Sequence, residues 1–152
     1  MDSGWVTAAF GLGGVVVGGV VNARVAAWAD RRARRNASRS ASRLVAEEIQ
    51  LLQNLVKASI TTGIYGPSVD GGGLPTTEWQ LNRQVLAGLE VETWRAVSEV
   101  YSAVAHLEIV LALNDPPPQA GGTVSDADQP GYKRLSTVCE TALAKLQPII
   151  SR

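Results

Sequence analysis

The sequence predicts an all-α protein, in which an N-terminal single transmembrane helix is followed by a small antiparallel helical bundle of three to four helices. Three observations lead to this prediction. The run Trp5–Val21 is apolar and uncharged, and apolar residues farther along recur at intervals of three and four. No stretch shows the period-two alternation of a half-buried strand. We therefore expect one helix in a membrane and the others around a common core.

The predicted anchor has no ionisable residue from Ser3 to Ala23. As a helix this run is about 30 Å long, which is enough to cross the hydrocarbon core of a bilayer. Trp5 and Trp28 bracket the run, and indole rings prefer the headgroup zone. The sequence thus predicts a short external N-terminus over residues 1–4 and a transmembrane helix over residues 5–29.

Two other interpretations of the same run were weighed. A cleaved signal peptide begins with a basic segment, whereas here Asp2 is the only charged side chain before the run and the arginines follow it. A buried helix of a water-soluble protein would be destabilised by the many glycines. We favour the membrane anchor over both.

A basic segment follows the apolar run. Its arginines are Arg24, Arg31, Arg32, Arg34, Arg35, Arg39 and Arg43. Because basic residues stay on the cytoplasmic side, we expect a plasma (inner) membrane protein with its N-terminus outside and its C-terminal domain in the cytosol. We also expect the arginines from Arg31 to Arg43 to contact anionic lipid headgroups. Phosphorylation of Ser38, Ser40 or Ser42 would weaken that attraction.

Small residues form one face of the predicted anchor. Gly14 and Gly18 make a G-x-x-x-G pair, and Asn22 continues the same face. Such a face lets two helices approach closely, and a buried Asn amide can hydrogen-bond across them. The pattern predicts helix association through these three residues. The other interpretation, a chance match among the small residues common in membrane helices, stays open.

The rest of the chain is predicted to be a basic juxtamembrane segment over residues 30–43 and a cytosolic helical domain over residues 44–152. Helices are expected over 37–60, 77–88, 91–113 and 132–150, with Thr76 or Thr77 capping the second of these. Glycine and proline place loops near 63–76 and 114–131. The apolar stripes of the first and third helices are Val45, Ile49, Leu52, Val56 and Ile60, then Trp94, Val97, Tyr101, Val104, Leu107 or Glu108, and Leu111. Whether the anchor runs into the first of these helices without a break is left open.

The sequence offers little for chemistry. With one histidine and one cysteine, no closed zinc site can form. A Cys139–His106 nucleophilic pair is one interpretation; the one that we favour is an exposed histidine and a buried thiol. The glycine-rich stretches lack the context of a phosphate loop. We therefore expect no catalytic residue, no bound metal and no cofactor.

These observations predict a non-enzymatic, single-pass membrane protein that acts as a scaffold, an adaptor or a small subunit of a membrane complex. The alternative is an oligomeric, holin-like protein that permeabilises the membrane. The expected partners are a bilayer with anionic headgroups and a protein partner or a second copy of the chain. Nucleic acid is not expected, because the domain beyond residue 43 is acidic although the net charge of the chain is zero.

Overall fold

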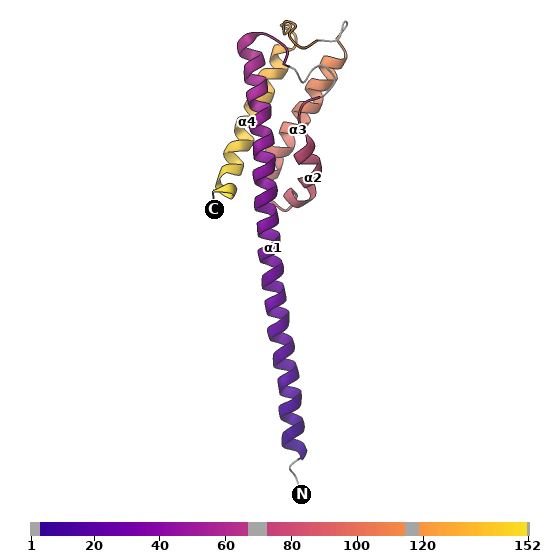
Figure 1. Cartoon of the computed structure of the whole chain (residues 1–152), viewed down its shortest axis with the longest axis vertical. Coiled ribbons are helices and arrows are strands. Elements are labelled where there is room, and N and C mark those ends of the chain that lie inside the picture. Colours follow the sequence, from indigo (N-terminus) through magenta and orange to yellow (C-terminus); the bar gives the residue numbers. More distant parts are fainter. Residues whose placement is uncertain (1–3, 67–72, 115–118, 152) are drawn as a thin grey trace. The chain divides into compact units, whose positions relative to one another are not determined.

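The computed structural model describes the backbone of residues 4–66, 73–114 and 119–151. Side chains are described from Asn22 onward within those ranges, except that of Ala23. The helices are α1 (Gly4–Thr62), α2 (Thr77–Leu86), α3 (Val91–Ala112) and α4 (Gln129–Ile150), labelled in Figure 1. The described residues include no strand, only an isolated antiparallel bridge between Ile64 and Thr123. The prediction of an all-helical fold is confirmed.

The chain divides into two compact units, Met1–Ala37 and Ser38–Arg152. In the first unit the backbone is helical from Gly4 onward, so the helix predicted for Trp5–Val21 is present. Among the residues whose side chains are described, no helix is long and apolar enough to cross a membrane. The side chains of Trp5–Val21 lie outside those residues. The membrane span therefore stays a prediction.

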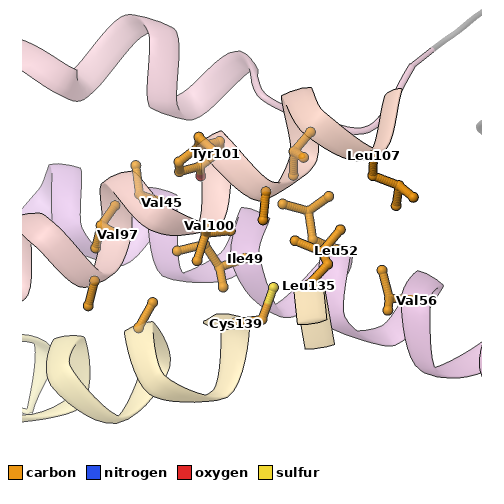
Figure 2. Packing of buried hydrophobic residues seen from close by; sticks show 14 of the residues in the cluster. Val45, Ile49, Leu52, Val56, Val97, Val100, Tyr101, Leu107, Leu135 and Cys139 are labelled. Atoms are coloured by element: carbon orange, nitrogen blue, oxygen red, sulfur yellow. The ribbon is translucent and has the colours of Figure 1, made fainter. Parts of the chain in front are cut away.

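The second unit is a helical bundle built from residues 38–62 of α1 together with α2, α3 and α4. Helices α3 and α4 pack directly against each other, and α4 runs back alongside α3 (Figure 1). Figure 2 shows buried side chains from α1, α3 and α4 pointing toward one another. They include Val45, Ile49, Leu52 and Val56 of α1, Val97, Val100 and Leu107 of α3, and Leu135 and Cys139 of α4. Most residues of the predicted stripes thus form one core. Ile60 is an exception, because at the end of α1 it is 37% exposed, and Trp94 is only half-buried.

The ends of the helices follow from local chemistry. α1 ends at Thr62 because Gly63 adopts a φ of +66°, a left-handed conformation that glycine reaches without steric cost. The Gly63 N–H donates to the Ser59 carbonyl at 2.9 Å, which satisfies one of the last carbonyls of α1. α4 begins at Gln129 rather than at Tyr132, because Pro130 in its first turn has no N–H that would need a partner.

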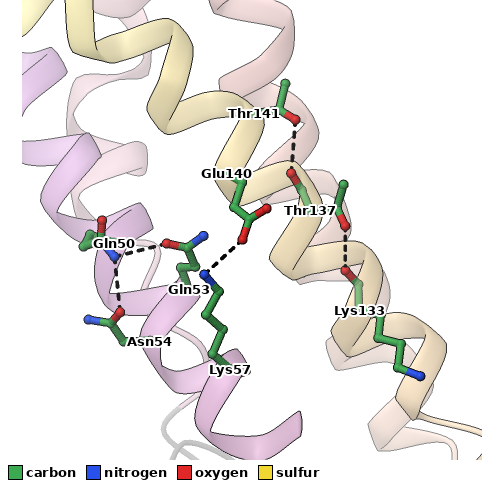
Figure 3. Close-up of polar contacts among 8 residues, drawn as sticks. All are labelled: Gln50, Gln53, Asn54, Lys57, Lys133, Thr137, Glu140 and Thr141. Atoms are coloured by element: carbon green, nitrogen blue, oxygen red, sulfur yellow. Dashed lines mark hydrogen bonds and ion pairs between the residues drawn. The ribbon is translucent and has the colours of Figure 1, made fainter. Parts of the chain in front are cut away.

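The outer surface shared by α1 and α4 is polar (Figure 3). Lys57 of α1 forms an ion pair with Glu140 of α4 at 2.9 Å. The Gln50 amide donates to Gln53 at 3.1 Å and to Asn54 at 3.2 Å. Both members of the ion pair are more than half exposed, so the pair contributes at most about 1 kcal/mol. The buried apolar side chains therefore supply most of the stability of the bundle.

Replacing Leu52 by alanine is expected to lower the free energy of unfolding of the full chain by about 2–5 kcal/mol, because Leu52 is fully buried. The matched control is Leu51→Ala. Leu51 is 50% exposed, so the loss should stay below about 1 kcal/mol. Urea denaturation followed by circular dichroism measures both. Equal losses would contradict the assignment of the core face of α1.

Candidate functional site

A buried carboxylate joins three helices of the bundle. Glu48 lies among the core residues of α1 and is 7% exposed. Its Oε2 accepts the backbone N–H of Glu78 at 2.8 Å. Its Oε1 accepts the N–H of Trp79 at 3.2 Å and the hydroxyl of Tyr101 at 2.7 Å. Because the first N–H groups of a helix have no partner within it, Glu48 caps α2 from a different helix and also binds α3.

This cap differs from the one that the sequence predicts. Thr76 does occupy the N-cap position of α2, but its side chain makes no capping hydrogen bond. The N–H groups of Glu78 and Trp79 are bound by Glu48 instead. A charged acceptor makes a stronger hydrogen bond than a hydroxyl, and it also interacts favourably with the positive end of the helix dipole.

An aromatic stack lies beside this carboxylate. The ring of Trp79 is stacked on that of Tyr101, with centroids 4.7 Å apart, and lies 5.1 Å from that of Trp94. Burial, and then the hydrogen bond to Glu48, raise the pKa of Tyr101 well above its usual range. Its hydroxyl therefore remains a donor at physiological pH. The two tryptophans pack against the core, so the stack positions α2 on α3.

A second glutamate holds the segment before α2. Glu108 of α3 accepts the backbone N–H of Leu74 at 2.8 Å. Gly73 has a φ of +65°, and a Cβ added there would lie 3.1 Å from a Glu108 carboxylate oxygen. Gly73 is the one member of the Gly71–Gly73 triplet within the described residues. Glycine thus allows the chain to pass close to Glu108.

A third polar network closes the loop end of the bundle. Asp128, at the N-cap position of α4, is 2% exposed. Its Oδ2 accepts hydrogen bonds from the Tyr65 hydroxyl, the Ser125 hydroxyl and the Asn114 amide. Burial, and then the hydrogen bond to Asp128, raise the pKa of Tyr65. The network therefore ties the loop after α1 to the end of α3 and the start of α4.

The two residues considered for nucleophilic chemistry occupy different environments. His106 is exposed on α3, whereas Cys139 is completely buried in the core. Burial, and then the neighbouring charge of Glu140, raise the pKa of the Cys139 thiol to about 12. Because the thiolate is the reactive form, this thiol is held in its unreactive form at neutral pH. Within the described ranges, no three His, Cys, Asp or Glu side chains gather as a metal site requires.

The arginines predicted to contact headgroups lie on α1 and are exposed. These residues are Arg31, Arg32, Arg34, Arg35, Arg39 and Arg43. The Arg31 Nε donates to the Ala27 carbonyl at 3.1 Å, and the Arg32 guanidinium lies 5.4 Å from the centroid of the Trp28 ring. Arg34 instead forms an ion pair with Asp30 at 2.8 Å. The arginines of the first unit therefore differ in how much of their charge is free to bind a ligand.

The predicted association residues are described only in part. Gly14 and Gly18 lie in the helical backbone of α1, but their surroundings are outside the described side chains. Asn22 is exposed. Among the serines considered for phosphorylation, Ser40 is exposed and Ser38 is half-buried, whereas Ser42 is fully buried. Ser42 is therefore out of reach of a kinase in the folded chain, which corrects that part of the sequence interpretation.

Sequence reasoning did not identify the roles of Glu48 and Asp128. The available signal for Glu48 was its place between Val45 and Leu52, at a helical spacing that turns it toward the core. A carboxylate in such a position needs several donors, because an unsatisfied buried charge is costly. Asp128 gave no comparable signal, because it precedes its helix in a loop rich in polar residues.

Replacing Glu48 by glutamine is expected to lower the free energy of unfolding by about 1–3 kcal/mol. The substitution places an NH₂ group where donors converge on both carboxylate oxygens. The near-ultraviolet circular dichroism of the Trp79–Tyr101 stack should weaken as well. Glu47→Gln is the matched control, because Glu47 is exposed. A stability loss as large in Glu47→Gln would contradict the capping role.

The buried thiol predicts a loss of stability at alkaline pH. The pKa of Cys139 is raised from 9.0 to about 12 in the folded chain, so between these values the unfolded chain releases the proton first. The contribution of Cys139 to the free energy of unfolding should therefore be constant well below pH 9 and fall as pH rises toward 12. Denaturation at stepped pH measures this, and Cys139→Ala should show a smaller decline. An identical decline in both would contradict the assignment.

The chain matches no known family model, no curated protein and no solved structure. The proposals that follow are therefore argued from the residues, contacts and charges of this chain.

Proposed function

We propose that this chain is a single-pass, membrane-anchored, non-enzymatic protein that presents a helical bundle to a protein partner or to a second copy of itself. The N-terminus lies outside the membrane and the bundle lies in the cytosol. The observation that carries this proposal is a helical backbone without an ionisable residue from Ser3 to Ala23, followed at once by exposed arginines. That order of apolar span and basic segment is the one that a cytoplasmic C-terminus requires.

The bundle supports a role in binding rather than in catalysis. Its buried polar groups, Glu48 and Asp128, hold helices and loops together through their hydrogen bonds. Its cysteine is buried and protonated. Acid–base or nucleophilic catalysis needs such groups to converge on a substrate. The role that this arrangement supports best is that of a folded domain recognised by its surface.

Helix association is assigned to the face of Gly14, Gly18 and Asn22. At about 100° per residue, Asn22 lies about 180° around the helix from Arg31. The exposed Asn22 side chain is therefore turned away from Arg31. Arg32 lies at the same angle as Gly14, so the two sets are separated along the helix, with the association residues before Arg24 and the headgroup residues after it. This separation supports both assignments together.

Changing Gly14 and Gly18 to leucine is expected to reduce crosslinking between copies in native membranes at least about tenfold, because the added side chains prevent close approach. Mild chemical crosslinking followed by sizing against the 16.1 kDa chain measures the products. Insertion, measured as resistance to alkaline carbonate extraction, should not change. A double variant that still crosslinks fully would remove these glycines from the association face.

The matched control is Gly13→Leu. Gly13 adjoins Gly14 but lies about 100° away around the helix, so leucine there should leave crosslinking intact. Loss of crosslinking in this control would show that glycine content matters, rather than one face. A single adduct with another protein, in place of a ladder of multiples, would identify a partner instead of a second copy.

A further inference from the structure

We propose that one face of α1 in the first unit binds anionic phospholipid headgroups, and that Arg34 is not part of it. We name it the arginine–tryptophan face and define it as Arg24, Trp28, Arg31, Arg32 and Arg35. The inference rests on the proposed membrane anchor and deepens it, since it names the lipid class and the residues that recognise it.

The helical geometry brings these five residues together. At about 100° per residue they fall within an arc of about 100° around the helix. All five side chains are exposed. Four guanidinium groups on one arc place several positive charges toward the same surface, where they can act on it together. A spanning helix that is tilted leans one side toward the membrane surface as it leaves the bilayer, so charges gathered on that side come closer to the phosphates than charges on the other sides.

Arg34 is excluded on two grounds. It lies about 60° beyond the edge of this arc. Its guanidinium also forms an ion pair with Asp30 at 2.8 Å, which offsets part of its charge although both side chains are exposed. Asp30 lies farther from the arc than Arg34, so its negative charge does not oppose the arginine–tryptophan face directly. The sequence alone placed Arg34 among the headgroup residues, on an equal footing with Arg31 and Arg35.

Trp28 favours a lipid surface over other anionic partners. Its side chain is 59% exposed and lies within the arc of arginines, with the Arg32 guanidinium 5.4 Å from its ring centroid. An indole ring at the headgroup level has an apolar body beside the acyl chains and a polar N–H beside the phosphates. The uncharged run from Ser3 to Ala23 also ends directly before Arg24, which places Arg24 and Trp28, at the start of this face, near the phosphates of a bilayer.

The test uses the full chain reconstituted into vesicles of equal phosphatidylcholine and phosphatidylglycerol. The chain is then re-extracted in mild detergent, and the ratio of the two phospholipids that remain bound is measured by mass spectrometry. We expect Arg31→Gln or Arg35→Gln to lower the retained ratio of phosphatidylglycerol to phosphatidylcholine by up to about fivefold, the factor expected for one basic residue at the surface. Trp28→Ala should lower it less, because that substitution removes no charge.

Arg34→Gln is the matched control, because it removes the same charge within one helical turn. It should leave the ratio nearly unchanged. An equal fall in Arg31→Gln and Arg34→Gln would show that net charge alone attracts the lipid, and it would overturn the proposed face. A wild-type chain that retains both lipids equally, or that prefers a labelled DNA duplex to phosphatidylglycerol, would overturn it as well.

A second measurement separates this inference from the anchor on which it rests. Flotation of the chain with vesicles of phosphatidylcholine alone, after a carbonate wash, tests the anchor without any anionic headgroup. If the chain fails to float there, the anchor is wrong. In that case the face is tested by itself with vesicles of phosphatidylglycerol. Flotation with these vesicles should be lost in high salt and in Arg31→Gln but kept in Arg34→Gln. Equal flotation of the two variants would again overturn it.

Discussion

The arrangement of the bundle depends on the hydrogen bonds that the buried Glu48 carboxylate accepts. A buried charge costs several kcal/mol unless donors surround it, and here two N–H groups of α2 and the Tyr101 hydroxyl do so. α2 needs this contact, because Leu86 is its only fully buried residue and Trp79 is only half-buried. Glu48 therefore determines where a short and weakly buried helix docks, and the Trp79–Tyr101 stack follows from that position.

Asp128 is a second buried carboxylate, and its hydrogen bonds connect the loops at the other end of the bundle. Both carboxylates are buried among neutral donors, and the cationic side chains of this unit stay at its surface, as Lys57 does. A carboxylate that accepts several hydrogen bonds specifies one geometry, because each donor must reach it from a fixed direction. Apolar contacts have no preferred direction, so the core alone is compatible with several arrangements of the helices. The hydrogen bonds of Glu48 and Asp128 are directional and favour one of these arrangements.

The two units meet their surroundings in different ways. The bundle binds its buried carboxylates through internal hydrogen bonds, although Asp128 Oδ1 has no partner among the described residues. The described arginines of the first unit are exposed, and only Arg34 has an acidic partner on its own helix. This distribution of charge supports the proposed binding role. The residues proposed for helix association, Gly14, Gly18 and Asn22, all precede Arg24 along the helix, so the two proposed roles use different segments of it.

The periodicity and the breakers of the sequence predicted the helical segments of the bundle, most of their core faces and the loops between them. They left open whether the anchor continues into the first bundle helix, and α1 runs through both without a break. Apolar spacing, glycine and proline act within a few residues of the chain. The neighbouring sequence was therefore enough to predict Val45 and Ile49 as core residues and Gly63 as part of the loop after α1. Only the tertiary structure decided the contacts of Glu48 with Tyr101, 53 residues away, and of Asp128 with Tyr65, 63 residues away. It also showed that Ser42 is buried, whereas the Asp30–Arg34 pair has the i, i+4 spacing that a helix brings together locally. The long-range contacts depend on which surfaces meet, and neither composition nor periodicity encodes that.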